Sequence, residues 1–141
     1  MVAEEIKTLN VVKEVQIAAP ADVVFETVLE PHGPMKEMNM KLEAWVGGRW
    51  FRDLGNNTGH LWGHVQVIKP PKLLELVGPT MMSYPVASHI QYRLTEQPGG
   101  TLLKFTHQAF GLIPPDLQQN VSKGWGEMLD QIRAAAEKKR A

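Results

Sequence analysis

The sequence predicts an α+β fold in which a curved antiparallel sheet of about seven strands wraps around a long C-terminal helix, with one or two short helices after the first strand. Two observations carry this prediction. Most of the chain alternates apolar and polar residues between glycine- and proline-rich turns, as half-buried strands do. After residue 114 the period becomes that of an amphipathic helix. Such a helix can cover the apolar face of the sheet.

The first predicted strand runs from Leu9 to Ala19, with apolar residues at 11, 15 and 17 and polar residues at 14 and 16. Pro20 and Asp22 then mark a helix start, because proline is tolerated at the first helical position and a carboxylate favours the positive helix end. The buried stripe of this helix comprises Val24, Phe25, Val28 and Leu29. The break "EPHGP" ends it, and "MKEMN" predicts one further turn.

Six further strands are expected between turn signals such as Gly47-Gly48, "GNNTG" and "QPGG". They are Met40–Val46, Arg49–Leu54, His60–Lys69, Leu73–Val77, Val86–Glu96 and Thr101–Phe110. The last element is a helix from about Asp116 to Lys139, and one of its faces is apolar throughout. That face carries Val121, Trp125, Met128, Leu129, Ile132 and Ala136. The whole chain, 1–141, is interpreted as a single domain.

Four pieces of the sequence resemble one known superfamily, in the right order: "IAAPADVVFETVLE", "GGRWF", "GHVQVIKPPKLLEL" and "GW" at 124–125. The chain resembles the START-like or Bet v 1-like helix-grip (SRPBCC) superfamily, in the branch related to the activator of Hsp90 ATPase and to polyketide cyclases. The resemblance implies an elongated pocket between sheet and helix that takes an apolar or amphipathic small molecule. It implies no one reaction, since members are carriers, cyclases or co-chaperones.

Three hypotheses about function follow. The first is a binding protein for a hydrophobic or aromatic small molecule, which needs an apolar cavity. The second is a cyclase-like acid–base enzyme, which needs two convergent titratable groups in the cavity. The third is a chaperone-associated interaction module, which needs an exposed apolar patch. We favour the first, assign no catalytic residue and leave open whether the protein is an enzyme.

The charge composition argues against two classes of partner, nucleic acid and anionic membranes. Fifteen Lys plus Arg balance fifteen Asp plus Glu, so the chain lacks the basic field that nucleic acid or an anionic membrane would select. The absence of cysteine, of a secretory signal and of a long apolar run predicts a cytoplasmic protein without a membrane span. We expect no cofactor, and a homodimer stays open as an assembly.

The histidines do not predict a metal site. His60 and His64 lie four residues apart on one strand, about 13 Å, too far for one metal ion to reach both. A third ligand would have to come from His89 or His107, and no carboxylate is spaced to complete the set. We therefore predict no metal, and whether these four histidines act together is not decided by the sequence.

Ten residues are expected to line the cavity. They are Trp50, Leu61, Val65, Met82, Tyr84, Tyr92, Phe105, His107, Trp125 and Met128. The parity of Leu103 and Phe105 turns His107 inward, where it serves either as a structural histidine bonded to backbone or a tyrosine hydroxyl, or as a ligand or catalytic contact.

Parity also assigns two other strands. That of Ile90 and Leu94 turns Tyr92 inward and His89 outward. In the strand from residue 60, the apolar set Leu61, Val65 and Val67 is expected inside and Trp62 outside, unless a bulge at Gly63 reverses the local pattern. The methionines of "HGPMKEMNM" and "GPTMMSYP" suggest an adaptable pocket mouth.

Overall fold

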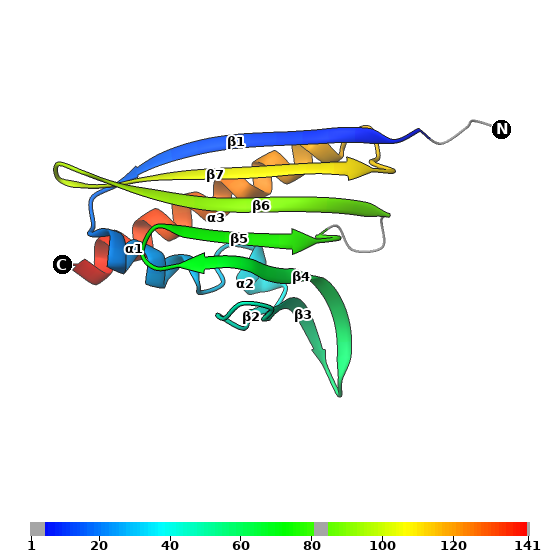
Figure 1. The fold of residues 1–141 in the computed structure, drawn as a ribbon, viewed down its shortest axis with the longest axis horizontal. Coiled ribbons are helices and arrows are strands. Elements are labelled where there is room, and N and C mark those ends of the chain that lie inside the picture. The colour runs from blue at the N-terminus through cyan, green and yellow to red at the C-terminus, as the bar shows by residue number, and fades with distance from the viewer. Residues whose placement is uncertain (1–4, 81–84, 141) are drawn as a thin grey trace.

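A computed structural model of the chain describes residues 5–80 and 85–140. One sheet of seven strands and a long C-terminal helix dominate it (Figure 1). The elements are β1 (Lys7–Ile17), α1 (Ala21–Val28), α2 (Pro34–Glu37), β2 (Met40–Leu42), β3 (Arg49–Gly55), β4 (Thr58–Lys69), β5 (Leu73–Gly78), β6 (Val86–Gln97), β7 (Gly100–Gly111) and α3 (Leu117–Arg140).

The sheet has the order β1-β7-β6-β5-β4-β3-β2, and every neighbouring pair is antiparallel. Strand β1, which is remote in sequence from the others, pairs along its full length with β7. Helix α3 crosses one face of the sheet and contacts β1, α1 and α2. The predicted α+β fold, a curved antiparallel sheet around a C-terminal helix, is confirmed.

The apolar stripe of α3 is buried against this face. Trp125, Met128, Leu129, Ile132 and Ala136 are each at most 4% exposed, because their helical spacing sets them on the side that meets the sheet. The strands pack against this stripe with side chains of one parity. Among them are Leu9, Leu74, Ile90, Leu103 and Phe105, each at most 2% exposed.

In the two described ranges, no helix combines the length and hydropathy that a membrane crossing requires.

The strand predicted from Met40 to Val46 is shorter than expected. Strand β2 ends at Leu42, and Trp45 and Val46 lie in an exposed loop, 59% and 71% exposed. Gly47 then has a φ of 81°, a conformation that favours glycine, and its N–H donates to the Val65 carbonyl. The backbone therefore turns before β3 instead of continuing the strand.

The parity prediction for the first half of β4 is wrong. Trp50 pairs with Gly63 and Phe51 pairs with Leu61, so Trp62 is an extra residue in β4, a β-bulge. The bulge moves Leu61 outward, where it is 47% exposed, and turns Trp62 inward, where it is 7% exposed. Glycine is required here because a Cβ at Gly63 would lie 2.5 Å from the Val77 carbonyl oxygen.

Candidate ligand site between sheet and helix

A small cavity lies between the sheet and α3, beside the segment that joins α1 to β2. Its volume is about 30 Å³, which is room for one or two water molecules. Its apolar wall includes Met35, Met40, Trp50, Leu74, Tyr92 and Met128. Glu30 and Lys41 also line it. The cavity is thus formed where four separate parts of the fold meet: the α1–α2 segment, the β2–β3 region, the centre of the sheet, and α3.

Three thioethers make this wall adaptable. Met35 comes from α2, Met40 from β2 and Met128 from α3, and all three are at most 8% exposed. Methionine has an unbranched side chain with three rotatable bonds, so it fits apolar shapes of different size. The wall can therefore be reshaped by side-chain rotation.

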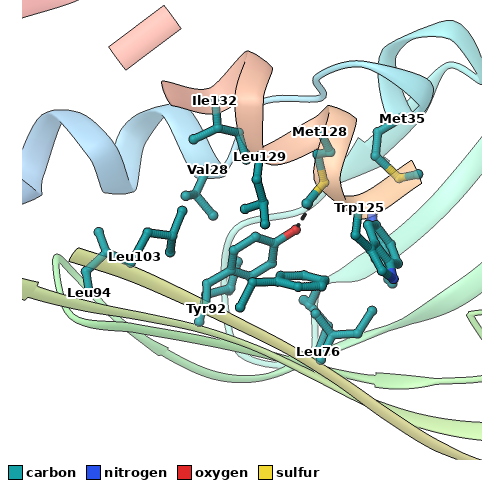
Figure 2. Close-up of a cluster of buried hydrophobic side chains, with 14 of the residues drawn as sticks. Val28, Met35, Leu76, Tyr92, Leu94, Leu103, Trp125, Met128, Leu129 and Ile132 are labelled. Carbon is teal, nitrogen blue, oxygen red and sulfur yellow. Dashed lines mark hydrogen bonds between the residues drawn. The ribbon is translucent and has the colours of Figure 1, made fainter. Parts of the chain in front are cut away.

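Tyr92 places a hydroxyl group in this wall. It is 5% exposed, and its hydroxyl donates to the Met128 Sδ at 3.5 Å (Figure 2). Figure 2 shows the Met128 side chain reaching from α3 toward the Tyr92 ring, which lies over the sheet. Burial raises the pKa of Tyr92 well above its usual value, so the phenol stays neutral.

Trp50 and Trp62 stack edge to face on the β3–β4 side of the cavity. Their ring centroids are 5.2 Å apart and their planes are inclined by 81°. The Trp62 Nε1 is buried and has no hydrogen-bond partner among the described residues, although the backbone oxygen of Trp62 accepts from the Thr80 N–H. Trp62 is therefore held in place by aromatic packing and not by a side-chain hydrogen bond to a described residue.

A second polar group, His107, lies in the packed core farther along β7. It is fully buried, as its parity predicts. Its Nδ1 accepts from the Trp125 Nε1–H at 2.9 Å, and its Nε2 lies 3.0 Å from the Ser88 Oγ. The expected partners, a backbone group or a tyrosine hydroxyl, are wrong: a tryptophan and a serine take that place.

These contacts fix the protonation of His107. An indole N–H can only donate, so Nδ1 must be unprotonated and Nε2 carries the hydrogen of the neutral ring. Burial lowers the pKa of His107 to about 4, which keeps it neutral near pH 7. A ring whose Nε2 donates to Ser88 cannot take the proton of that hydroxyl, so this pair is not a nucleophile with its base.

Contacts between neighbouring aromatic rings connect the two polar groups. Tyr92 contacts Phe105 at 5.1 Å between centroids, Phe105 contacts Trp125 at 5.1 Å, and Trp125 contacts His107 at 5.6 Å. Residues from β6, β7 and α3 thus form one continuous aromatic row under the helix. It separates His107 from the methionine-lined cavity.

The predicted cavity residues fall into four groups. Trp50, Tyr92 and Met128 line the cavity. Val65, Phe105, His107 and Trp125 are buried in the core next to it and are not part of its wall. Leu61 faces solvent because of the bulge, so its assignment to the cavity is wrong. Met82 and Tyr84 lie outside the described residues.

Sequence reasoning missed part of the wall. Leu74 and Leu76 share one parity of β5 and are buried, a signal that was present in "LLELV". Met35 and Met40 belong to the methionine cluster that suggested a pocket mouth, and they line the cavity.

The charged side chains at the cavity already have partners. The Lys41 Nζ lies 2.7 Å from the Asp53 carboxylate, and the Lys139 Nζ lies 2.6 Å from Glu30. These pairs lie in the more exposed part of the lining. Both charged side chains of the lining are therefore engaged in ion pairs at its exposed edge.

The histidines lie in different parts of the fold. His107 is buried under α3, whereas the His89 Nε2 lies 3.2 Å from Glu75 on the opposite face of the sheet. Partial burial opposes ionisation of Glu75, but hydrogen bonds from Gln91, His89 and Gln66 outweigh it and lower its pKa. Within residues 5–80 and 85–140, no group of three potential metal ligands comes together.

Comparison with known proteins places the chain in a family. The profile of the family described as activator of Hsp90 ATPase homolog 1-like protein matches residues 18–137. None of the curated proteins compared with the chain matches it.

Several solved structures share the fold at low sequence identity. A putative uncharacterized protein from Rhizobium leguminosarum has a TM-score of 0.72 and 22% identity, covering 95% of this chain and 97% of that one. CalU16 from Micromonospora echinospora has a TM-score of 0.63 and 19% identity, covering 96% and 88%. The di-domain ARO/CYC StfQ from the steffimycin biosynthetic pathway has a TM-score of 0.66 and 13% identity, covering 94% of this chain and 51% of that one.

Proposed function

The chain belongs to the family of activator of Hsp90 ATPase homolog 1-like proteins, and on that premise we propose that it binds a small, uncharged, largely apolar molecule in the cavity between sheet and α3. The observation that carries the proposal is the composition of the wall. Three thioethers and two aromatic rings surround a void, and the charged groups at the same cavity are paired elsewhere. An apolar site with few polar groups is what small-molecule binding requires.

Binding requires the cavity to enlarge. The void of about 30 Å³ is much smaller than an apolar cavity that accommodates benzene, which needs roughly 150 Å³. Part of the wall can move to make this space, because Met35 lies on a helix of four residues and Met40 on a strand of three. Rotation of these thioethers, with a small shift of α2, opens space without breaking the main sheet.

The acid–base alternative is less well supported. Such an enzyme needs two titratable groups that converge on the substrate. Among the described residues that line the cavity, Tyr92 is neutral and Glu30 and Lys41 are engaged in ion pairs. His107 is separated from the cavity by the aromatic row.

The interaction-module alternative rests on exposed apolar residues near the β3–β4 hairpin, which projects beyond the rest of the sheet (Figure 1). Trp45, Val46 and Leu54 are 59%, 71% and 54% exposed. Nothing in the described part of the chain identifies what would cover them, so the cavity carries the proposal.

The test uses methionine methyl groups as reporters. We would label the methionines with ¹³C at the methyl position and titrate the protein with α-methylstyrene, a neutral aromatic hydrocarbon. Saturable shifts at Met35, Met40 and Met128 are expected, because all three line the cavity. The absence of any saturable shift, or equal shifts at every methionine, would reject the site.

A matched pair of variants checks the location. Leu42 lines the cavity and is partly exposed, so Leu42→Trp should obstruct it. Val12 lies on β1 with 53% exposure and serves as the control position for Val12→Trp. We expect the first variant to weaken α-methylstyrene binding at least fivefold and the second to leave it unchanged.

A further inference from the structure

We propose that the Tyr92 hydroxyl is the polar anchor of this cavity, and that its preferred ligands are neutral aromatic molecules with one carbonyl oxygen, such as aryl ketones. This inference rests on the proposed function and gives it a substrate class. It concerns selectivity within the cavity, which the shape of the wall alone does not determine.

The hydroxyl of Tyr92 is a hydrogen-bonding group of the wall that has only a weak partner. Its one hydrogen bond within residues 5–80 and 85–140 is to the Met128 Sδ, at 3.5 Å. A thioether is a weak acceptor, whereas a buried hydroxyl normally finds an oxygen or nitrogen partner. A ligand oxygen placed beside Tyr92 would therefore replace a weak acceptor by a strong one.

The two charged side chains of the described lining are already engaged in ion pairs. Lys41 is held by Asp53 at 2.7 Å, and Glu30 is held by Lys139 at 2.6 Å. Recruiting either one would break an existing ion pair. Tyr92 only exchanges one acceptor for another, and it lies at the centre of the sheet beneath α3.

The chemistry of the site favours a neutral acceptor. An anionic ligand would lose its hydration without meeting an unpaired cation, because Lys41 is already paired. The neutral state of Tyr92 makes its hydroxyl a donor, which matches a carbonyl oxygen. The flanking wall of Trp50, Met35 and Met40 matches an aromatic body.

The experiment compares three probes of nearly the same shape at pH 7.5. Acetophenone carries the carbonyl oxygen, α-methylstyrene has a methylene group in its place, and benzoate carries a charge. Dissociation constants for the wild type and for Tyr92→Phe would come from the methionine methyl titration. This variant keeps the ring and removes the hydroxyl alone.

We expect the wild type to bind acetophenone about fivefold more tightly than α-methylstyrene and to bind benzoate more weakly than either, because one neutral hydrogen bond contributes about that factor. Tyr92→Phe should remove the preference for acetophenone and leave α-methylstyrene binding within twofold. Equal affinity of the two neutral probes for the wild type, or a preference that survives in Tyr92→Phe, overturns the inference while leaving the site intact. Failure of all three probes rejects the proposed function itself.

A second variant tests the exchange of acceptors directly. Met128→Leu keeps the volume of the side chain and removes the sulfur that Tyr92 now uses. Among the described residues the hydroxyl then has no acceptor, so acetophenone should bind about threefold more tightly relative to α-methylstyrene than it does in the wild type. A smaller ratio than in the wild type contradicts the anchor role.

Discussion

The two polar sites under α3 both use residues of β6 and α3 but differ in how well their polar atoms are paired. At one, His107 accepts from Trp125 at 2.9 Å and contacts Ser88 at 3.0 Å, so both ring nitrogens have partners. At the other, the Tyr92 hydroxyl meets, among the described residues, only a sulfur at 3.5 Å, beside a small void. The first site is a closed structural contact and the second has unused bonding capacity.

This difference in pairing assigns a role in stability to one part of the α3 face and a role in ligand binding to another part. Trp125 and Met128 are three residues apart on α3, so one helix contributes to both sites. The Trp125 ring is fixed by a directional hydrogen bond, whereas the Met128 side chain can change rotamer at small cost. We therefore expect substitutions at the first site to act on folding and those at the second to act on ligands.

The largest expected effect is that of Trp125→Ala. It removes a ring that is 4% exposed and leaves His107 without its donor, so the free energy of unfolding should fall by about 3 kcal/mol or more. Urea denaturation followed by circular dichroism measures this loss. Trp125→Phe keeps most of the ring and should cost less, and a loss within about 0.5 kcal/mol for the alanine variant would contradict the structural role.

The next effect is a loss of stability in mild acid. Burial lowers the pKa of His107 to about 4 in the folded protein, whereas the unfolded chain has the ordinary value near 6.5. Above pH 6.5 the ring is neutral in both states and its contribution is complete. As the pH falls from 6.5 toward 4, only the unfolded state gains a proton, so stability decreases, by about 3 kcal/mol over the whole window.

The measurement is a urea denaturation series from pH 7.5 to pH 5. This range avoids the carboxyl groups of Glu43, Asp53 and Glu75, whose pKa values are lowered and which titrate in stronger acid. His107→Gln keeps a donor and an acceptor but does not titrate, so its profile should be flatter than that of the wild type. Parallel profiles for the two proteins would exclude His107 as the source.

A smaller effect is expected at the cavity. Met128→Leu conserves volume and removes only a weak acceptor, so it should cost about 1 kcal/mol, against about 2 kcal/mol or more for Met128→Ala. Both values come from the same denaturation assay. If Met128→Leu were as damaging as Trp125→Ala, the proposed contrast between a closed site and an adaptable one would be wrong.

The fold could be predicted because its signals are periodic. Alternation in β1, β6 and β7 and the helical stripe of α3 each depend on many residues, so one exception does not change the result. The inward positions of Tyr92 and His107 followed from the same alternation. Their hydrogen-bond partners could not be predicted in this way. Met128 and Trp125 belong to α3, and the alternation within a strand carries no information about which side chains of the helix pack on it.

The β3–β4 region shows where parity stops being informative. A single extra residue in β4 reverses the facing of Leu61 and Trp62, and the sequence indicated only that Gly63 could permit such a bulge. At Gly63 and Gly78 the backbones of β4 and β5 approach closely, and a Cβ on Gly78 would lie 2.4 Å from the Gly63 Cα. That pairing is tertiary and has no local sequence signature.

The smallest expected effect tests this correction. Leu61 is 47% exposed on the outer side of the bulge, so Leu61→Ala should change the free energy of unfolding by no more than about 0.5 kcal/mol. Val65, four residues later on the same strand, is 2% exposed and serves as the control, with a loss of about 2 kcal/mol expected for Val65→Ala. Strict alternation would instead place both side chains inside and make both losses large. Urea denaturation of the two variants side by side therefore distinguishes a bulged strand from a regular one, and a loss at Leu61 equal to that at Val65 would restore the regular strand.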